Sequence, residues 1–219
     1  TYTVEVTDSE GCTATSHVTV EVNPELFADA GDDKSLCYGS DVMLDGSASG
    51  GDGNYEFSWS PTDGLNNANT ATPVASPEST TTYTLTVTDG IDCIDTDQMV
   101  VEVNDAVYVN AGDDVIICHE GEIQLEANVD GGTPSYEYYW TPAEGLSDQN
   151  ISNPVAQPET TTTYTVEVTD SEGCTATSHV IVEVNPEIIA DAGDDKSLCY
   201  GSDVMLDGSA SGGDGNYEF

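Results

Sequence analysis

Arginine is absent from the 219-residue sequence, and only two lysines, Lys34 and Lys196, oppose 42 acidic residues, which gives a formal net charge of -40. Proteins that bind nucleic acid use Lys or Arg to displace the counterions of the phosphates, so this composition excludes nucleic acid as a partner. The same shortage argues against attraction to an anionic membrane surface. No apolar run approaches the ~20 residues of a membrane-spanning helix, which predicts no membrane insertion in this segment.

Short motifs of catalysis and of zinc binding are also missing. The sequence has no C-x-x-C motif, and neighbouring cysteines in the series Cys12, Cys37, Cys93 lie 25 or 56 residues apart. Structural zinc sites need closer cysteine spacing. No G-x-S-x-G turn is present to hold a nucleophilic serine. We therefore predict that this segment is not an enzyme and has no catalytic residues.

The strongest signal that is present is an internal repeat. Residues 1–57 are identical to residues 163–219 except at three positions. A more divergent copy starts halfway between them, because "TYTLTVTD" begins at Thr82, 81 residues after Thr1 and 81 before Thr163. A fixed period of this kind indicates an array in which each period is one structural unit.

Strand patterns dominate each period. In "TYTLTVTDG", Tyr83, Leu85 and Val87 alternate with threonines, which is the period of two of a half-buried strand. "TDQMVVEVN" continues the alternation after the short turn "DGIDC", and the two segments together predict a hairpin. No stretch has the pattern of an amphipathic helix. Several short strands within about 80 residues predict an all-β sandwich.

The spacing of strand ends and starts predicts the domain boundaries. One strand ends in "VEVNPE" and the next begins at "ADAGDD", so the natural division falls near Asn23 and Pro24. This division gives two complete domains, 24–104 and 105–185. Residues 1–23 would be the last hairpin of a preceding domain, and residues 186–219 the first strands of a following one. We therefore expect the array to continue on both sides.

The first complete domain, "NPELFADAGDDKSL…VMLDGSASGGDG…YEFSWSP…TTYTLTVTDG", resembles PKD-type and related immunoglobulin-like repeats. The paired cysteines and the segment "TYTVEVTDSEGCTAT" are similar to repeats of giant surface proteins of Bacteroidota, including the gliding adhesins. The resemblance covers the whole chain, although the second domain has "LEANVDGG" where "LDGSASGG" is expected. It implies tandem immunoglobulin-like (PKD-like) β-sandwiches that are secreted, lie at the cell surface, and carry calcium at some domain junctions.

Three functions are compatible with this architecture. The first is a structural repeat segment of a large cell-surface adhesin or extracellular filament, in which the repeats provide reach and stiffness. The second is a multivalent module for carbohydrate or another ligand, with avidity arising from the number of repeats. The third is the accessory region of a secreted enzyme. In the first case the partners are neighbouring repeats and, in a fibre, other copies of the chain, while the surface ligand is unknown.

Calcium is the one cofactor that the residues suggest. Ca²⁺ needs six to eight oxygen ligands, and the "DAGDD" turn supplies Asp29, Asp32 and Asp33. Asp89 and Asp92, in the last hairpin turn of the same domain, could approach them. The later copies of the turn contain Asn110, Asp113, Asp114, Asp191, Asp194 and Asp195. The alternative is a solvated turn whose Asp side chains cap backbone amides.

The six cysteines indicate disulfides and an oxidising compartment. The default pairing lies within domains and joins Cys37 to Cys93 and Cys118 to Cys174. Cys37 should follow the first strand, however, and Cys93 should precede the last strand, near the opposite end of the sandwich. A disulfide needs Cα atoms ~4.4–6.8 Å apart, so a bridge from Cys37 to Cys174 of the next domain is the alternative. On the default pairing within domains, Cys12 and Cys199 would find their partners outside this sequence.

The aromatic residues of the third strand have two interpretations. Tyr55, Phe57 and Trp59 share one face and could form a carbohydrate-binding platform. Residues at this spacing on a strand more often belong to the core. The corresponding set, Tyr136, Tyr138 and Trp140, favours the core, because every domain must rebuild its core.

Overall fold

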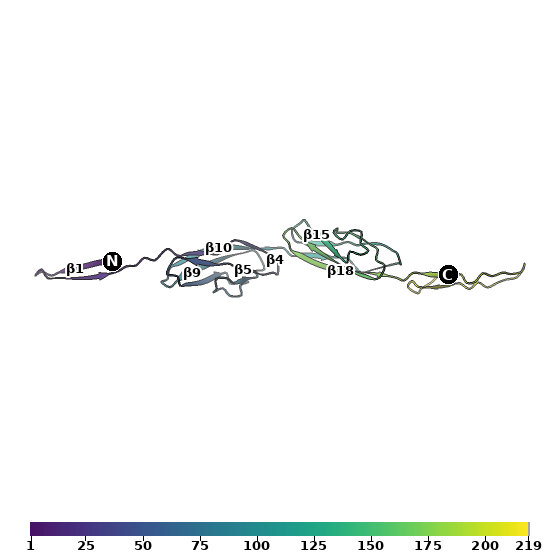
Figure 1. The fold of residues 1–219 in the computed structure, drawn as a ribbon, viewed down its shortest axis with the longest axis horizontal. Helices are drawn as coiled ribbons and strands as arrows, with labels where there is room; N and C mark the ends of the chain where they lie inside the picture. Colours follow the sequence, from purple (N-terminus) through teal and green to yellow (C-terminus); the bar gives the residue numbers. More distant parts are fainter. Residues whose placement is uncertain (219) are drawn as a thin grey trace. The chain divides into compact units, whose positions relative to one another are not determined.

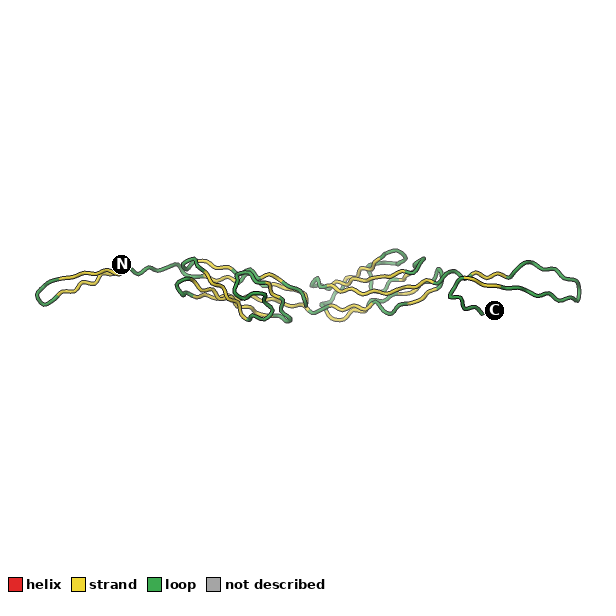
Figure 2. Tube along the Cα trace, turned by 90° about the horizontal axis from the view of Figure 1, so that it is seen from below, coloured by secondary structure: helices red, strands yellow, loops and turns green. Residues whose placement is uncertain are grey.

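The computed structural model describes residues 1–218 and divides into two compact units, Thr1–Val103 and Asn104–Phe219. All regular elements of the described chain are β-strands, drawn as arrows in Figure 1 and in yellow in Figure 2. No helix capable of crossing a membrane occurs among these residues. The division after Val103 lies next to the boundary expected at residues 104 and 105, and the four-part domain scheme stays a prediction.

The first unit contains short strands and one long hairpin. Its strands are β1 (Tyr2–Thr7), β2 (Thr13–Val18), β3 (Phe27–Asp29), β4 (Lys34–Cys37), β5 (Val42–Met43), β6 (Ser47–Ser49), β7 (Tyr55–Ser60), β8 (Val74–Ala75), β9 (Thr81–Asp89) and β10 (Ile94–Asn104). One sheet has the order β4-β10-β9-β7, and the pairs β3-β6 and β5-β8 form the opposing layer. The predicted hairpin is confirmed, since β9 and β10 pair antiparallel from Thr88↔Ile94 to Thr81↔Val101.

Alternation along β9 builds the core of this unit. Tyr83, Leu85 and Val87 are fully buried, and the intervening threonines lie on the outer face because successive side chains of a strand point to opposite sides. Trp59 of β7 is buried beside them and donates its Nε1–H to the carbonyl of Thr70 at 3.0 Å. Leu44 completes the centre of the cluster.

Two segments of the first unit each contribute two separate strands. "FADAGDDKSLC" bends at Gly31, whose φ is +81°, so that β3 pairs with β6 while β4 joins β10 in the other sheet. The segment "DVMLDGSAS" forms the separate strands β5 and β6. The Pro-rich segment after Thr70 contributes the two-residue strand β8, which pairs with β5.

The second unit repeats this arrangement. Its strands are β11 (Val107–Asn110), β12 (Val115–Ile117), β13 (Ile123–Gln124), β14 (Asn128–Gly131), β15 (Glu137–Thr141), β16 (Val155–Ala156), β17 (Thr162–Thr169), β18 (Thr175–Val184), β19 (Ile189–Asp191) and β20 (Ser209–Ser211). The main sheet has the order β12-β18-β17-β15, with β12 parallel to β18. Strand β11 pairs with β14 and contacts β17 and β18, which places the second layer on the first.

Equivalent core residues fill the second unit. Trp140, Tyr164, Val166 and Val168 are fully buried. The Nε1–H of Trp140 donates to the carbonyl of Ile151 at 2.9 Å, which matches the bond made by Trp59. The interpretation of the tryptophans as core residues is therefore correct for both units.

The hairpin β1-β2 has the sequence of β17-β18 but a different environment. Tyr2, Val4 and Val6 are 68%, 57% and 62% exposed, whereas their counterparts in β17 are buried. No described strand covers the apolar face of β1-β2, which pairs only within itself. The hairpin therefore has the sequence of a core element without the layer that packs on it in the second unit.

Candidate functional site

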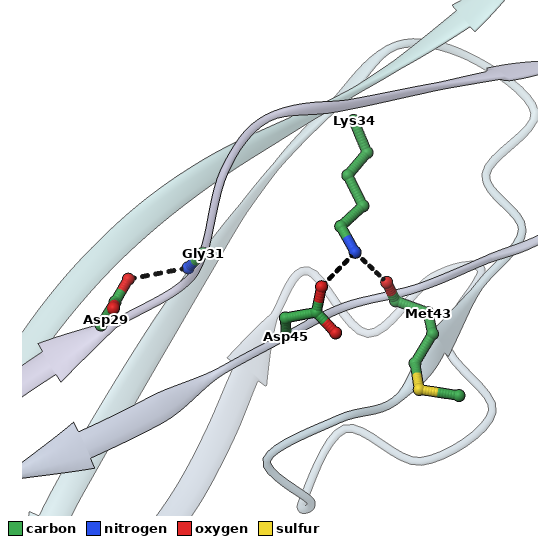
Figure 3. Close-up of polar contacts among 5 residues, drawn as sticks. All are labelled: Asp29, Gly31, Lys34, Met43 and Asp45. Carbon is green, nitrogen blue, oxygen red and sulfur yellow. Dashed lines mark hydrogen bonds and ion pairs between the residues drawn. The ribbon is translucent and has the colours of Figure 1, made fainter.

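The "DAGDD" turn of the first unit uses its carboxylates as backbone caps. Asp29 Oδ1 accepts a hydrogen bond from the backbone N–H of Gly31 at 2.9 Å (Figure 3). Asp33 Oδ1 accepts one from the N–H of Val100 on β10 at 2.7 Å. Asp32 is exposed. These contacts match the capping alternative, in which Asp side chains bind nearby backbone amides.

Later copies of the turn repeat the pattern. Asn110 Oδ1 accepts from the N–H of Gly112 at 2.9 Å, and Asp191 Oδ1 accepts from that of Gly193 at 2.8 Å. Asp114 Oδ1 accepts from the N–H of Ile181 at 2.8 Å. The other predicted ligands in these turns, Asp113, Asp194 and Asp195, are exposed. The turn thus fastens the first part of each complete domain to its last strand.

Asp89 lies in a different place from the "DAGDD" turn and is buried, with 4% of its surface exposed. Its Oδ1 accepts from the N–H groups of Ile91 and Cys93 at 3.0 and 2.9 Å, and its Oδ2 accepts from that of Asp52 at 3.2 Å. Asp52 Oδ1 in turn accepts from the N–H of Gly90 at 3.1 Å. This reciprocal clamp joins the last hairpin turn to the Gly-rich loop before β7.

Hydrogen bonds tune the electrostatics of this clamp. Backbone and side-chain hydrogen bonds from Asn54, with the N–H of Gly90, hold the pKa of Asp52 below its ordinary value. Desolvation by the surrounding turn raises the pKa of the exposed Cys93 thiol, and the carboxylates of Asp89, Asp52 and Asp92 raise it further. A thiol with a raised pKa forms less of the nucleophilic thiolate at neutral pH.

Asp170 is the counterpart of Asp89 in the second unit and is equally buried, at 4% exposure. Its Oδ1 accepts from the N–H groups of Cys174 and Glu172 at 2.8 and 3.0 Å, and its Oδ2 accepts from that of Thr133 at 2.8 Å. Burial alone would raise the pKa of Asp170, but these backbone hydrogen bonds outweigh burial and lower it.

Glycine is required beside this carboxylate. Gly132 has a φ of +65°, and a Cβ atom at this position would lie 2.5 Å from Val107 Cγ2 and 2.9 Å from Asp170 Oδ2. Only a residue without a side chain lets the loop approach closely enough for the next N–H, that of Thr133, to reach the carboxylate.

The expected meeting of the two groups of acids does not occur. Asp33 is bonded to Val100, and Asp89 to the hairpin turn that precedes β10. Seven residues of strand separate Val100 from Cys93, or about 23 Å at the rise of a strand. No three acidic, histidine or cysteine side chains of residues 1–218 are arranged to hold a metal ion. The residues therefore do not form the ligand set that the sequence suggested.

Calcium binding itself stays a prediction, and the individual "DAGDD" turns are its candidate sites. If Ca²⁺ binds the "DAGDD" turns, 1 mM CaCl₂ should raise the melting temperature of the chain after exhaustive chelation, while equimolar MgCl₂ should not, because Mg²⁺ keeps its waters and demands stricter geometry. Calorimetric scans with Asp32→Asn as the matched variant test this expectation. Identical melting curves in calcium and in chelator would contradict it.

Cysteine geometry contradicts the default pairing within domains. In the second unit Ile117 pairs with Val184, at the far end of β18, whereas Cys174 directly precedes that strand. Ten residues of strand separate the two ends, or about 33 Å at 3.3 Å per residue. A bridge between Cys118 and Cys174 is therefore impossible, since a disulfide needs Cα atoms within about 7 Å. The first unit has the same strand order around β4 and β10.

Oxidation states agree with this geometry. Cys93 and Cys118 carry free, exposed thiols, as do Cys12 and Cys199. Cys37 and Cys174 are disulfide-bonded. Neither Cys37–Cys93 nor Cys118–Cys174 is therefore formed, and both pairings are corrected.

The alternative pairing of Cys37 with Cys174 stays a prediction. Digestion of the unreduced chain should yield one linked peptide pair that contains these two residues, and mass spectrometry identifies it. Treatment with a reductant should separate the pair, and Cys37→Ser should remove it. Recovery of a linked Cys37–Cys93 or Cys118–Cys174 pair from the folded protein would contradict both the geometry and the prediction.

Both lysines are neutralised within their own domain. Lys34 Nζ donates to the carbonyl of Met43 at 2.6 Å and lies 2.5 Å from Asp45 Oδ2 (Figure 3). Lys196 makes the same contacts with Met205 and Asp207, at 2.8 and 2.6 Å. The chain therefore presents its negative charge to solvent without an unpaired lysine.

Comparison with known proteins gives likenesses both in sequence and in structure. No protein-family model matches the chain. A mouse protein, dyslexia-associated protein KIAA0319-like protein, is 34% identical over 221 residues that cover 85% of this chain. The match spans 21% of the length of that mouse protein.

The structural likeness decides the fold. The N-terminal eight immunoglobulin domains of Down Syndrome Cell Adhesion Molecule superpose with a TM-score of 0.57 at 16% identity, covering 96% of this chain and 30% of that one. The chain is a tandem array of immunoglobulin-like β-sandwiches. This result confirms the all-β, tandem-sandwich prediction.

Among the functional residues, sequence reasoning missed Asp52 and Asp170, and it gave Asp89 a different role. A signal for them was present. The acid that begins the hairpin turn recurs as Asp8, Asp89 and Asp170, and a Gly-Gly pair recurs before each third strand, at 50–51, 131–132 and 212–213. Because the turn acid and the glycine pair recur together, they could have predicted that the last hairpin turn meets the Gly-rich loop.

Proposed function

We propose that this chain is a structural segment of a large, secreted cell-surface adhesion protein, in which the immunoglobulin-like domains act as spacers. We further propose that it belongs to the PKD-type surface proteins of Bacteroidota that the sequence resembles. A stalk of this kind holds a binding tip away from the cell or forms an adhesive filament. We expect no enzymatic activity from the segment itself.

One observation carries the proposal, namely the kind of residue that recurs at the 81-residue period. Trp59 and Trp140 fill equivalent cores, and Asp89 and Asp170 cap equivalent turns. These side chains make a domain fold. Surface groups that would make a ligand site recur less strictly, since Lys34 is replaced by Val115 in the next copy. Strict repetition of the scaffold residues, together with looser repetition of surface residues such as Lys34, favours a spacer over a multivalent binder.

The charge of the chain supports an extracellular, hydrated role. A net charge of -40 keeps the repeats soluble and repels neighbouring chains at low ionic strength. The disulfide-bonded state of Cys37 and Cys174 suits an oxidising compartment. Protease treatment of intact source cells, followed by immunoblotting against this segment, tests the surface location.

A glycan array separates the spacer from the carbohydrate-binding alternative. The 219-residue chain, labelled and probed at micromolar concentration, should give no saturable signal on any glycan. A saturable signal that is lost when Tyr55 and Tyr136 are changed to alanine would replace the spacer by a multivalent sugar-binding module. Asp41→Asn, an exposed change in the loop before β5, serves as the matched control variant.

A further inference from the structure

Strand β7 is an edge of the main sheet in the first unit, and half of that edge is open. In the order β4-β10-β9-β7, β7 pairs on one side with β9, with Glu56 opposite Thr88 and Ser58 opposite Thr86. On its other side the N–H of Trp59 donates to the carbonyl of Ala68 at 2.8 Å. The chain itself thus occupies the position of the next strand beside Trp59.

The backbone groups that precede Trp59 have no such neighbour. Residues two apart on a strand direct their N–H and C=O groups to the same side, so Tyr55 and Phe57 present theirs to the same open side as Trp59. No described residue pairs with these backbone groups as a neighbouring strand would. An unpaired edge of this kind is a template for an additional strand.

A pocket lies along this open stretch. It has a volume of about 400 Å³ and is lined by Tyr55, Glu56, Phe57, Ser58, Asn69 and Thr88. The rings of Tyr55 and Phe57, whose centroids are 6.4 Å apart, form its aromatic side. Glu56 and Ser58, which also line the pocket, are exposed. The pocket therefore combines backbone partners, an apolar surface and a carboxylate.

We propose that the open edge of β7 binds an extended, positively charged peptide segment of a partner protein as an additional strand. Main-chain hydrogen bonds to Tyr55 and Phe57 give such strand addition its affinity. Alternate side chains of the bound segment face Glu56 on one side and the two rings on the other, so Lys or Arg suits the first set and apolar residues the second. This inference goes beyond the spacer role, and its failure leaves that role intact.

Charge selects the class of partner. With a net charge of -40 and both lysines paired to aspartates of their own domains, the surface repels a second copy of this chain and attracts a basic segment. Opposite charges directly across two paired strands are favourable, and like charges are not. A basic segment is therefore favoured over homotypic pairing of two β7 edges.

The second unit has the same open edge. Strand β15 is the outer strand in the order β12-β18-β17-β15, and the N–H of Trp140 donates to the carbonyl of Gln149 at 2.8 Å. Glu137 and Tyr138 occupy the places of Glu56 and Phe57. Each complete domain thus offers one site for a bound strand.

The test uses the full chain and a defined probe, an end-capped heptapeptide of alternating Lys and Val, at 150 mM salt. Backbone amide resonances of Tyr55 to Ser58 and of the equivalent residues in β15 should shift and saturate. A fully N-methylated version of the peptide, which keeps the charge but lacks N–H donors, should bind at least about tenfold more weakly. This control changes no residue of the protein, so it holds even if a variant fails to fold.

Protein variants locate the site. Glu56→Lys should weaken binding at β7 about tenfold and leave β15 unchanged, and Phe57→Pro should abolish binding at β7 because it removes an outward N–H. Asp41→Lys, an exposed change far along the chain, should have little effect.

Equal binding of the two peptides, shifts spread over the whole acidic surface, or no binding would overturn the proposal. So would self-association of the chain that Phe57→Pro abolishes, since it would assign the edge to a second copy.

Discussion

Replacement of Trp59 by alanine should lower the free energy of unfolding of the first unit by about 3–5 kcal/mol, the usual cost of removing a buried tryptophan. The side chain is 1% exposed, so its removal leaves a cavity among Leu44, Tyr83 and Leu85. The carbonyl of Thr70 also loses its hydrogen-bond donor. For a domain of this size the melting temperature should fall by about 15–30 °C.

The two tryptophans make the measurement specific to one unit. Each unit contains one of the two tryptophans of the chain, so in Trp59→Ala the remaining fluorescence reports only Trp140. That signal should melt at the temperature of the unchanged protein, while calorimetry shows the early transition of the first unit. Trp140→Ala should give the reverse pattern, and Tyr38→Ala, at a side chain that is 53% exposed, should change neither transition. A common shift of both transitions would contradict separate cores.

Much of the fold was predictable because the repeat and the alternation of apolar and polar residues with a period of two are visible in the sequence itself. Tyr83, Leu85 and Val87 indicate a strand with one buried face, and the structure has that face in the core. Failures occurred where one residue changes the path of the chain. Gly31 divides the segment from Ala28 to Cys37 that was expected to form the first strand, because its positive φ sends β4 to the other sheet. Composition alone does not reveal which glycine bends a strand.

Less of the site was predictable, because acidic residues are too abundant for spacing to distinguish their roles. Asp29, Asp33 and Asp89 are all near turns, and the expected position of the last hairpin turn at the entry end of the domain suggested one cluster. The structure gives each a separate backbone partner instead. Cysteine pairing was only partly predictable: the expected location of Cys37 and Cys93 at opposite ends of the sandwich argued against a bridge, yet pairing within domains was still the default and was wrong. The strand order of each unit settles that point.

Replacement of Asp170 by asparagine should lower the free energy of unfolding of the second unit by about 1.5–3 kcal/mol at pH 7, the range for hydrogen bonds to a charged group. Asparagine has one carbonyl oxygen, so it cannot accept from Thr133 on one side and from Cys174 and Glu172 on the other. The NH₂ group of the asparagine side chain would face backbone N–H groups, so a donor would stand against a donor. Fluorescence of Trp140 follows the melting of this unit, and Asp130→Asn at an exposed carboxylate is the matched control.

The pH dependence of this difference distinguishes a charged cap from a packing effect. Because the pKa of Asp170 is lowered in the folded unit, its carboxylate contributes stability fully above the ordinary pKa of about 3.9 and loses it as the pH falls below that value. The gap in stability between the unchanged protein and Asp170→Asn should therefore be constant from pH 7 to about pH 5 and shrink towards pH 2. Acidification also relieves repulsion among the many surface carboxylates, so the melting temperature of either protein alone is ambiguous. The difference between them cancels that common effect, and a gap that persists unchanged at pH 2 would show that charge on Asp170 contributes nothing.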